Sequence, residues 1–260
     1  MYNENNYPKV NGSVVTTKLA NAFMMDFTNS STNKTITNHI GMQNAFDKLI
    51  NKELDLIIVS SLTNNENEKA KQKNIELNME EVAKEGIVFM VSPENPVDSL
   101  TIEQIRKIYS GEITNWKELG GNDEKIMPYQ NIENSSIQYD MQKIVMEDKE
   151  LINPLAEDVK YKNENIFDVI SHYKNSAGSI GYTYYYFANL INSNHQIKLL
   201  KINGIEPSNS TIQNGQYPLK TSYYIVTRND KTEKAESLKN HMLSSRGQSI
   251  VEKAGYIPIK

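Results

Sequence analysis

A helix pattern that runs directly into a short apolar segment sets the framework for this chain. Five apolar residues share one face at helical spacing: Met42, Ala45, Phe46, Leu49 and Ile50. The run Leu54–Val59 follows almost at once. Such a run after a helix is typical of a parallel strand buried on both faces. The segment therefore predicts one helix and one strand of an α/β protein.

The same alternation of helix and strand patterns continues along the chain. A capping-box sequence, Thr63 to Glu66, opens a very polar helix. Further helix patterns cover residues 19–27, 101–109, 137–145, 166–173 and 245–254. Strand patterns or apolar runs cover residues 75–79, 86–91, 126–130, 181–187, 197–202 and 222–226. The fold class is therefore α/β with mixed, mostly parallel sheets and helices on both faces.

The alternating pattern is interrupted in the middle of the chain and resumes at its end. The turn-rich segment Ser92–Pro96 marks the first interruption. We expect one discontinuous lobe made of residues 1–91 and 217–260. A second lobe, residues 92–216, would be inserted between its halves, and 260 residues are enough for two such lobes.

Composition excludes several functional classes. A formal net charge of -4 gives no reason to expect a nucleic-acid partner. The chain has no cysteine, so disulfides and thiolate metal sites are excluded. No apolar run approaches the ~20 residues that span a bilayer. The hydrophilic start is not a signal peptide, so any export signal or anchor would lie upstream of Met1.

The sequence gives little support for catalysis. The four histidines are far apart and lack metal-ligand spacing, and no nucleophile elbow, phosphate-binding loop or dinucleotide fingerprint occurs. The aromatic run Tyr184–Phe187 could stack a ligand, although a strand leading into a packed helix explains it more simply. We expect no enzyme activity, no cofactor and no metal.

Two hydroxyl-bearing turns directly before helices are more informative. They are Gly12–Ser13 and Asn134–Ser136. The first N–H groups of a helix are unpaired and carry partial positive charge, so they attract anions. Hydroxyl groups add donors without formal charge. Each turn alone could be an ordinary cap, but one such turn in each predicted lobe favours a binding site.

Several long motifs resemble one protein family in order and spacing. They cover residues 86–97, 178–182, 214–219 and 245–258, together with the two central motifs Leu100–Gly111 and Ile113–Gly121. The chain resembles the phosphate-binding proteins of bacterial ABC importers, within the type II periplasmic-binding-protein superfamily. The resemblance spans nearly the whole chain.

This resemblance implies a fold, a location and partners. The fold would have two α/β lobes joined by two crossover segments, with a ligand cleft between them. Family members are exported or lipid-anchored, so this protein would be extracellular or on the cell surface, held by a segment absent from this chain. Its partners would be a small anionic or polar solute and a membrane permease. We expect a monomer.

The resemblance also implies which residues bind the ligand, and where this chain departs from the family. Ser13 and Val14 correspond to the first-lobe turn, and Gly41–Met42 to a second turn that has lost its serine. Ser60 stands where the family has the aspartate that takes the proton of phosphate. Asn131 stands at the family's arginine. The next turn keeps serine, and its implied ligands are Ser135 and Ser136, but threonine has become Ile137.

These substitutions predict a pocket with neutral donors. Removing a buried arginine from an anion clamp costs roughly 2–5 kcal/mol, whereas a neutral hydrogen bond contributes about 0.5–1.5 kcal/mol. We therefore expect weak phosphate binding. The leading hypothesis is a solute-binding protein for phosphate or a related oxyanion. The alternative is a surface sensor or interaction domain that kept the fold and lost phosphate binding.

Overall fold

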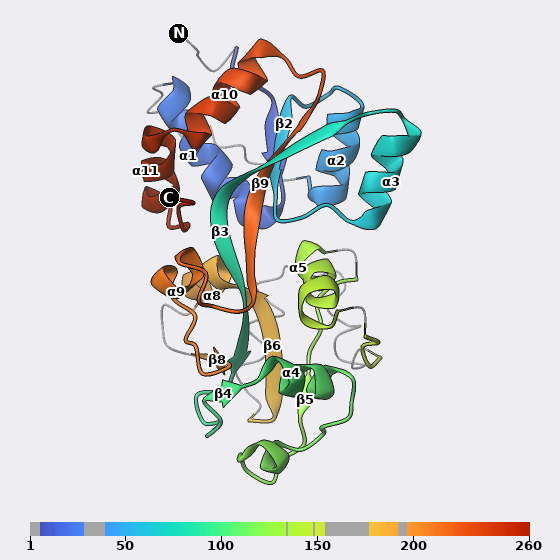
Figure 1. Cartoon of the computed structure of the whole chain (residues 1–260), viewed down its shortest axis with the longest axis vertical. Helices are drawn as coiled ribbons and strands as arrows, with labels where there is room; N and C mark the ends of the chain where they lie inside the picture. Colours follow the sequence, from blue (N-terminus) through green and yellow to red (C-terminus); the bar gives the residue numbers. More distant parts are fainter. Residues whose placement is uncertain (1–5, 29–39, 134, 148, 154–176, 192–196) are drawn as a thin grey trace. The chain divides into compact units, whose positions relative to one another are not determined.

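The computed structural model describes residues 6–28, 40–133, 135–147, 149–153, 177–191 and 197–260 (Figure 1). The chain forms two compact units, residues 1–85 with 221–260, and residues 86–220. Both boundaries lie a few residues from the expected positions after 91 and 216. The helix expected at 166–173 lies outside the described residues.

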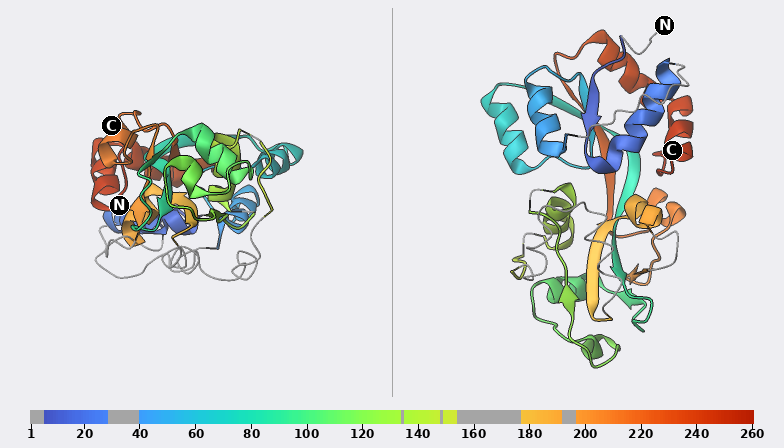
Figure 2. Two further views of the ribbon diagram at one scale, coloured as in Figure 1. Left: turned by 90° about the horizontal axis from the view of Figure 1, so that it is seen from below. Right: turned by 180° about the vertical axis from the view of Figure 1, so that it is seen from behind.

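The first unit is built on β1 (Val10–Gly12), β2 (Leu56–Val59), β9 (Lys220–Arg228) and the first part of β3 (Leu77–Val91). β1 pairs with β2 in parallel, and β9 pairs with β2 antiparallel. The helical elements are η1 (Val14–Thr16), α1 (Thr17–Thr28), α2 (Met42–Ile50), α3 (Asn64–Gln72), α10 (Glu233–Leu243) and α11 (Ser245–Lys253). Within this unit, α2 and α3 lie on one side of the strands, and α1, α10 and α11 on the other (Figures 1 and 2).

The apolar face expected for α2 is confirmed. Its five apolar residues are buried and share a core with Ile57, Val59 and Val226. The strand that follows is buried on both faces, since all four residues of β2 are fully enclosed. The capping box of α3 is also confirmed, with reciprocal contacts between Thr63 and Glu66.

The second unit contains the rest of β3 and two groups of short strands. β3 pairs antiparallel with β6 (Ser179–Tyr184) and β7 (Lys198–Leu199), and β5 (Met127–Pro128) pairs with β6 in parallel. A separate parallel pair joins β4 (Ser99–Leu100) to β8 (Lys201–Ile202). The helical elements are α4 (Ile102–Tyr109), η2 (Trp116–Leu119), α5 (Ser136–Asp140), η3 (Met141–Val145), α8 (Tyr185–Ile191) and α9 (Asn209–Gln213).

The α/β class and the mixed sheets are confirmed, but parallel pairs do not predominate. β9 and β3 each run antiparallel to a neighbour. β3 is long and passes from the first unit into the second along the chain, whereas β9 has only its first residue in the second unit. The sequence pattern at 75–79 and 86–91, expected to be two strands, is the single strand β3.

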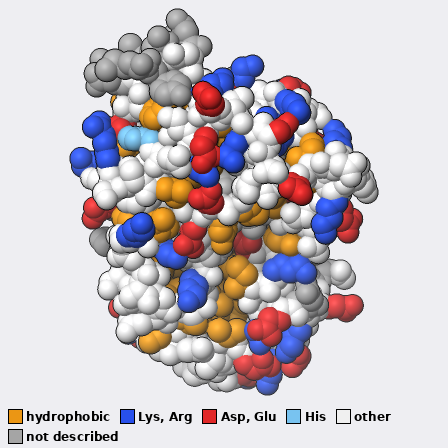
Figure 3. Space-filling model, turned by 45° about the horizontal axis from the view of Figure 1, so that its top comes forward, with side chains coloured by type: hydrophobic (Ala, Val, Ile, Leu, Met, Phe, Trp, Pro, Cys, Tyr) orange, Lys and Arg blue, Asp and Glu red, His pale blue; other side chains and the backbone are white. Residues whose placement is uncertain are grey.

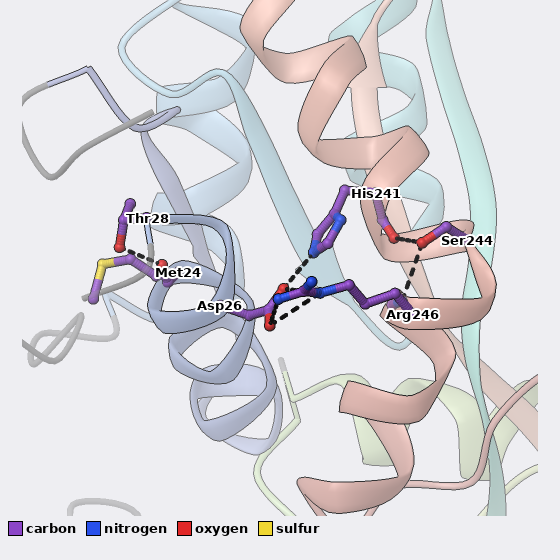
Figure 4. A network of polar contacts seen from close by, with 7 residues as sticks. Met24, Asp26, Thr28, His241, Ser244 and Arg246 are labelled. Carbon is purple, nitrogen blue, oxygen red and sulfur yellow. Dashed lines mark hydrogen bonds and ion pairs between the residues drawn. The ribbon is translucent and has the colours of Figure 1, made fainter. Parts of the chain in front are cut away.

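A carboxylate on α1 ties the first unit's helices together. The guanidinium of Arg246, on α11, makes a 2.8 Å ion pair with Asp26, and His241 Nε2 on α10 lies 2.9 Å from the same carboxylate (Figure 4). The hydrogen bond from Arg246 holds the pKa of Asp26 below its usual value, with partial burial opposing that effect and His241 supporting it.

We expect Asp26→Asn to lower Tm by a few degrees at neutral pH. Because the folded pKa is depressed, the stabilisation is complete above the ordinary aspartate pKa of about 3.9 and is lost as pH falls through the lower folded value. The difference in Tm between wild type and variant should therefore vanish in acid. Asp98→Asn, at an exposed ion pair with Lys198, is the control and should change Tm little. A pH-independent difference would contradict this account.

Charges of both signs are interspersed on the face of the molecule drawn in Figure 3. Among the described residues, no helix is long and apolar enough to cross a membrane.

Candidate functional site

The candidate residues of the first unit lie at one edge of its sheet. β1 and β2 are parallel, with Gly12 opposite Ile58, so their carboxyl ends meet at the same edge. Ser13 follows β1 directly, and Ser60 follows β2. Both are buried, with exposed fractions of 8% and 0%. The structure therefore brings these two predicted residues to a common edge.

The turn after β1 is unusually tight. A side chain at Gly12 would place its Cβ 2.1 Å from the Ile58 carbonyl oxygen, which only glycine avoids. Thr16 Oγ1 donates to that same oxygen at 2.7 Å. The start of the helical segment is thereby fixed against β2, and the position of Ser13 follows from it.

Ser13 does not act as an ordinary helix cap. Its side chain accepts no hydrogen bond from a backbone N–H of η1, and its Oγ instead makes a 3.3 Å hydrogen bond with Thr16 Oγ1. Val14, the next residue, is 37% exposed. Because its side chain is apolar, only its backbone N–H can donate to a polar ligand. Because η1 continues directly into α1, the positive end of the helix dipole lies at this turn.

Two more helices begin at the same edge. α2 packs on β1 and β2 and leads into β2, so its N-terminus lies at the strand's carboxyl end. It starts at Gly41, whose positive φ of 78° suits glycine and which provides no capping side chain. α3 starts just after β2 and is capped by Thr63. The N-termini of α2 and α3, with the partial positive charge of their helix dipoles, therefore lie at this edge.

The sequence interpretation missed one hydroxyl here. Ser61 Oγ is buried and has no hydrogen-bond partner among the described residues. A buried hydroxyl without a partner is costly unless something else satisfies it, such as water or a bound molecule. Adjacency to Ser60 was the only available signal in the sequence.

A buried carboxyl group stands nearby in the chain, in the first turn of α3. Burial raises the pKa of Glu66, although hydrogen bonds from the backbone and side chain of Thr63 oppose the effect. These contacts form the capping box, and they explain why a glutamate tolerates this position.

The candidate residues of the second unit form one turn and the helix that follows. Ser135 caps α5, because its Oγ accepts from the Gln138 N–H at 3.3 Å. Ser136 is buried at the first position of the helix. The Asn131 side chain donates to the Tyr182 carbonyl at 3.1 Å. The structure thus keeps these three predicted residues together, and Ile137 is a core residue with 2% exposure.

The arginines are all engaged outside the candidate residues. Arg106 pairs with Glu147, and Arg246 pairs with Asp26. The third, Arg228, is buried and donates to the carbonyls of Leu49 and Leu54 at 2.6 Å and 2.8 Å. The polar groups described above at both candidate turns are hydroxyls, amides and backbone N–H groups. They can bind an oxyanion or a polar solute without a guanidinium. No cluster of three or more metal-ligating side chains occurs among the described residues.

Comparison with known proteins places the chain in a family. The family model for the PBP superfamily domain matches residues 7–246. The phosphate-binding protein PstS of Borreliella burgdorferi is 28% identical over 265 residues, covering 96% of this chain and 89% of that protein. PstS of Bacillus subtilis is 27% identical over 180 residues, covering 69% of this chain and 57% of that protein.

Two solved structures are also similar. A candidate phosphate ABC transporter substrate-binding protein with bound phosphate, from Clostridium perfringens, has a TM-score of 0.74 and 26% identity, covering 98% of this chain and all of the other. PstS from Borrelia burgdorferi has a TM-score of 0.62 and 27% identity, with 96% and 98% covered.

Proposed function

The chain belongs to the PBP superfamily, and from this membership we propose that it is the solute-binding protein of a phosphate-type ABC importer. Its ligand is phosphate or a related oxyanion. The two similar PstS proteins described above are named as phosphate-binding proteins, and the similar structure from Clostridium perfringens contains bound phosphate. It acts by binding its ligand, not as an enzyme.

The observation that carries the proposal is the edge of β1 and β2. Helix N-termini lie there, and Ser13, Ser60 and Ser61 add hydroxyl groups. The Ser61 hydroxyl is buried and has no hydrogen-bond partner among the described residues. Such an array supplies donors to an anion without a formal positive charge. Asn131 and Ser136 are the proposed donors of the second unit. Ser135 caps the helix that carries Ser136, and its hydroxyl already donates to the Ile132 carbonyl at 2.7 Å.

The binding experiment is titration calorimetry together with thermal unfolding in inorganic phosphate. Phosphate should raise Tm, because at 100 times Kd a ligand stabilises the folded state by about 2.7 kcal/mol. Ser13→Ala should weaken binding by roughly fivefold to tenfold, the loss of about one neutral hydrogen bond.

Ser208→Ala provides the matched control. Ser208 caps α9, so this variant loses a capping hydroxyl far along the chain from the proposed ligands, and its Kd for phosphate should equal that of the wild type. Sulfate and other oxyanions are tested in parallel to identify the preferred solute. If none of these anions raises Tm, the alternative of a sensor or interaction domain is favoured instead.

The location and partners follow from the same proposal. An importer's binding protein works outside the cytoplasm, so we propose an extracellular or surface location and delivery of the ligand to a membrane permease. The relatives named as binding proteins support this assignment. Fractionation of cells that make the native protein tests it, and a purely cytosolic protein would contradict it.

A further inference from the structure

The first turn of α5 has the residues of a capping box but lacks the reciprocal bond that completes the box at α3 and α4. Thr63 with Glu66 and Thr101 with Gln104 form capping boxes, in which the third helical residue reaches back to the backbone N–H of the cap. In α5, Ser135 and Gln138 occupy the equivalent positions. Here the Ser135 N–H donates to the Ile132 carbonyl at 2.9 Å instead. The Gln138 side chain is therefore used elsewhere.

The Gln138 amide binds the turn that precedes its own helix. Its Oε1 accepts from the Asn131 N–H at 3.0 Å and from the Tyr182 hydroxyl. Its Nε2 donates to Gln130 Oε1 at 3.2 Å, and Gln130 in turn donates to the Ile152 carbonyl at 2.8 Å. One side chain thus uses both its acceptor and its donor to fix residues 130 and 131.

Tyr182 connects this network to the core of the second unit. Its ring is fully buried and packs against Phe89 and Tyr109, with ring centroids 5.8 Å and 5.5 Å apart. Its carbonyl accepts from the Asn131 side chain at 3.1 Å. The turn at Asn131 is therefore held at its backbone and side chain by groups anchored in a rigid core.

We propose that Gln138 is a positioning residue for ligand binding: it fixes the Asn131 turn relative to Ser135 and Ser136. This inference rests on the proposed function. Neutral donors contribute little individually, so their value depends on being held in place before the ligand arrives. A glutamine suits the task because its amide both accepts and donates.

The test compares two glutamines at equivalent helix positions, Gln138→Ala and Gln104→Ala. Both variants lose the side chain of the third helical residue, so both should lower Tm. Gln138→Ala should also raise the Kd for inorganic phosphate roughly tenfold to a hundredfold, or about 1.4–2.8 kcal/mol. Gln104→Ala should leave Kd unchanged, because the Gln104 side chain bonds only the cap of α4 in the described network.

Two further measurements separate positioning from general destabilisation. Amide exchange at Asn131 should accelerate in Gln138→Ala, with or without phosphate, because its N–H has lost an acceptor. Tyr182→Phe should weaken phosphate binding less, because it removes only the second and longer acceptor of the Asn131 N–H, the Tyr182 hydroxyl at 3.3 Å.

The possible failures are distinguishable. Equal phosphate affinity in wild type and Gln138→Ala would overturn the positioning role and leave the proposed function standing. So would equal losses of affinity in Gln138→Ala and Gln104→Ala, since binding would then simply follow stability. A wild type that binds no phosphate would refute the proposed function and this inference with it.

Discussion

Gly12→Ala is expected to lower the free energy of unfolding by about 3 kcal/mol or more and to abolish phosphate binding. The added Cβ would lie 2.1 Å from the Ile58 carbonyl oxygen and 2.7 Å from Thr16 Oγ1. The Ile58 oxygen belongs to a buried strand, so it cannot withdraw without disturbing the pairing of β1 with β2. Ser13, next in the chain, would be displaced with it.

The control is a glycine whose substitution causes strain without a clash. Gly204 has a φ of 77° and no atom within 4 Å of an added Cβ. Gly204→Ala should cost only about 1–2 kcal/mol and leave phosphate affinity unchanged. Urea unfolding and calorimetry on both variants decide the matter. Similar stabilities for the two variants, or normal phosphate binding by Gly12→Ala, would contradict the prediction.

Helices and strands whose apolar residues mark the face that is buried were predictable from the sequence. The five apolar residues of α2 are all buried, and β2 is enclosed on both faces, because one helix face and one central strand meet the same core. Helix starts were predictable where a local capping box exists, as at Thr63. These signals need no knowledge of distant residues.

The continuity of β3 was not predictable, because its middle is charged. Glu80 and Glu81 interrupt the apolar pattern, yet their carboxylates are bound by Lys239 and Ser222, far away in the sequence. Lys84 adds a local ion pair with Glu81 at 2.6 Å. Long-range partners stabilise a strand that local periodicity divides in two.

The candidate site was predictable only in part, for the same reason. Hydroxyls before helices identified Ser13 and Ser135, but Ser135 caps its helix whereas Ser13 does not. Gln138 could not be distinguished from an ordinary capping residue until its contacts with Asn131 and Tyr182 were known. Which polar residues carry a ligand depends on which are already bound.

Asn131→Arg is expected to tighten phosphate binding by about tenfold to a hundredfold. A guanidinium binds phosphate oxygens through two parallel, charge-assisted hydrogen bonds, whereas the asparagine amide is neutral. The substitution loses the 3.1 Å bond from the Asn131 side chain to the Tyr182 carbonyl. It keeps the backbone bond from residue 131 to Gln138, so the turn should retain its position.

Two other substitutions implied by the family resemblance should help less. Ile137 is 2% exposed, so Ile137→Thr would remove apolar contacts from the core. Ser60 is fully buried, and Ser60→Asp would place a carboxylate beside an anion, which is unfavourable unless the two share a proton. Each should therefore give little or no gain in phosphate binding on its own.

Asn131→Lys and Asn131→Gln are the controls for the arginine variant. Lysine supplies the charge without the planar pair of donors, so its gain should be smaller, and glutamine should give none. The gain from arginine should also persist in salt better than that of an exposed charge, because a partly buried pair is screened less. Calorimetry with phosphate at two ionic strengths provides the measurement. Equal gains for arginine and lysine would show that charge alone acts at residue 131. Sub-micromolar binding by the wild type would show that neutral donors already suffice, and the arginine would then have little to add.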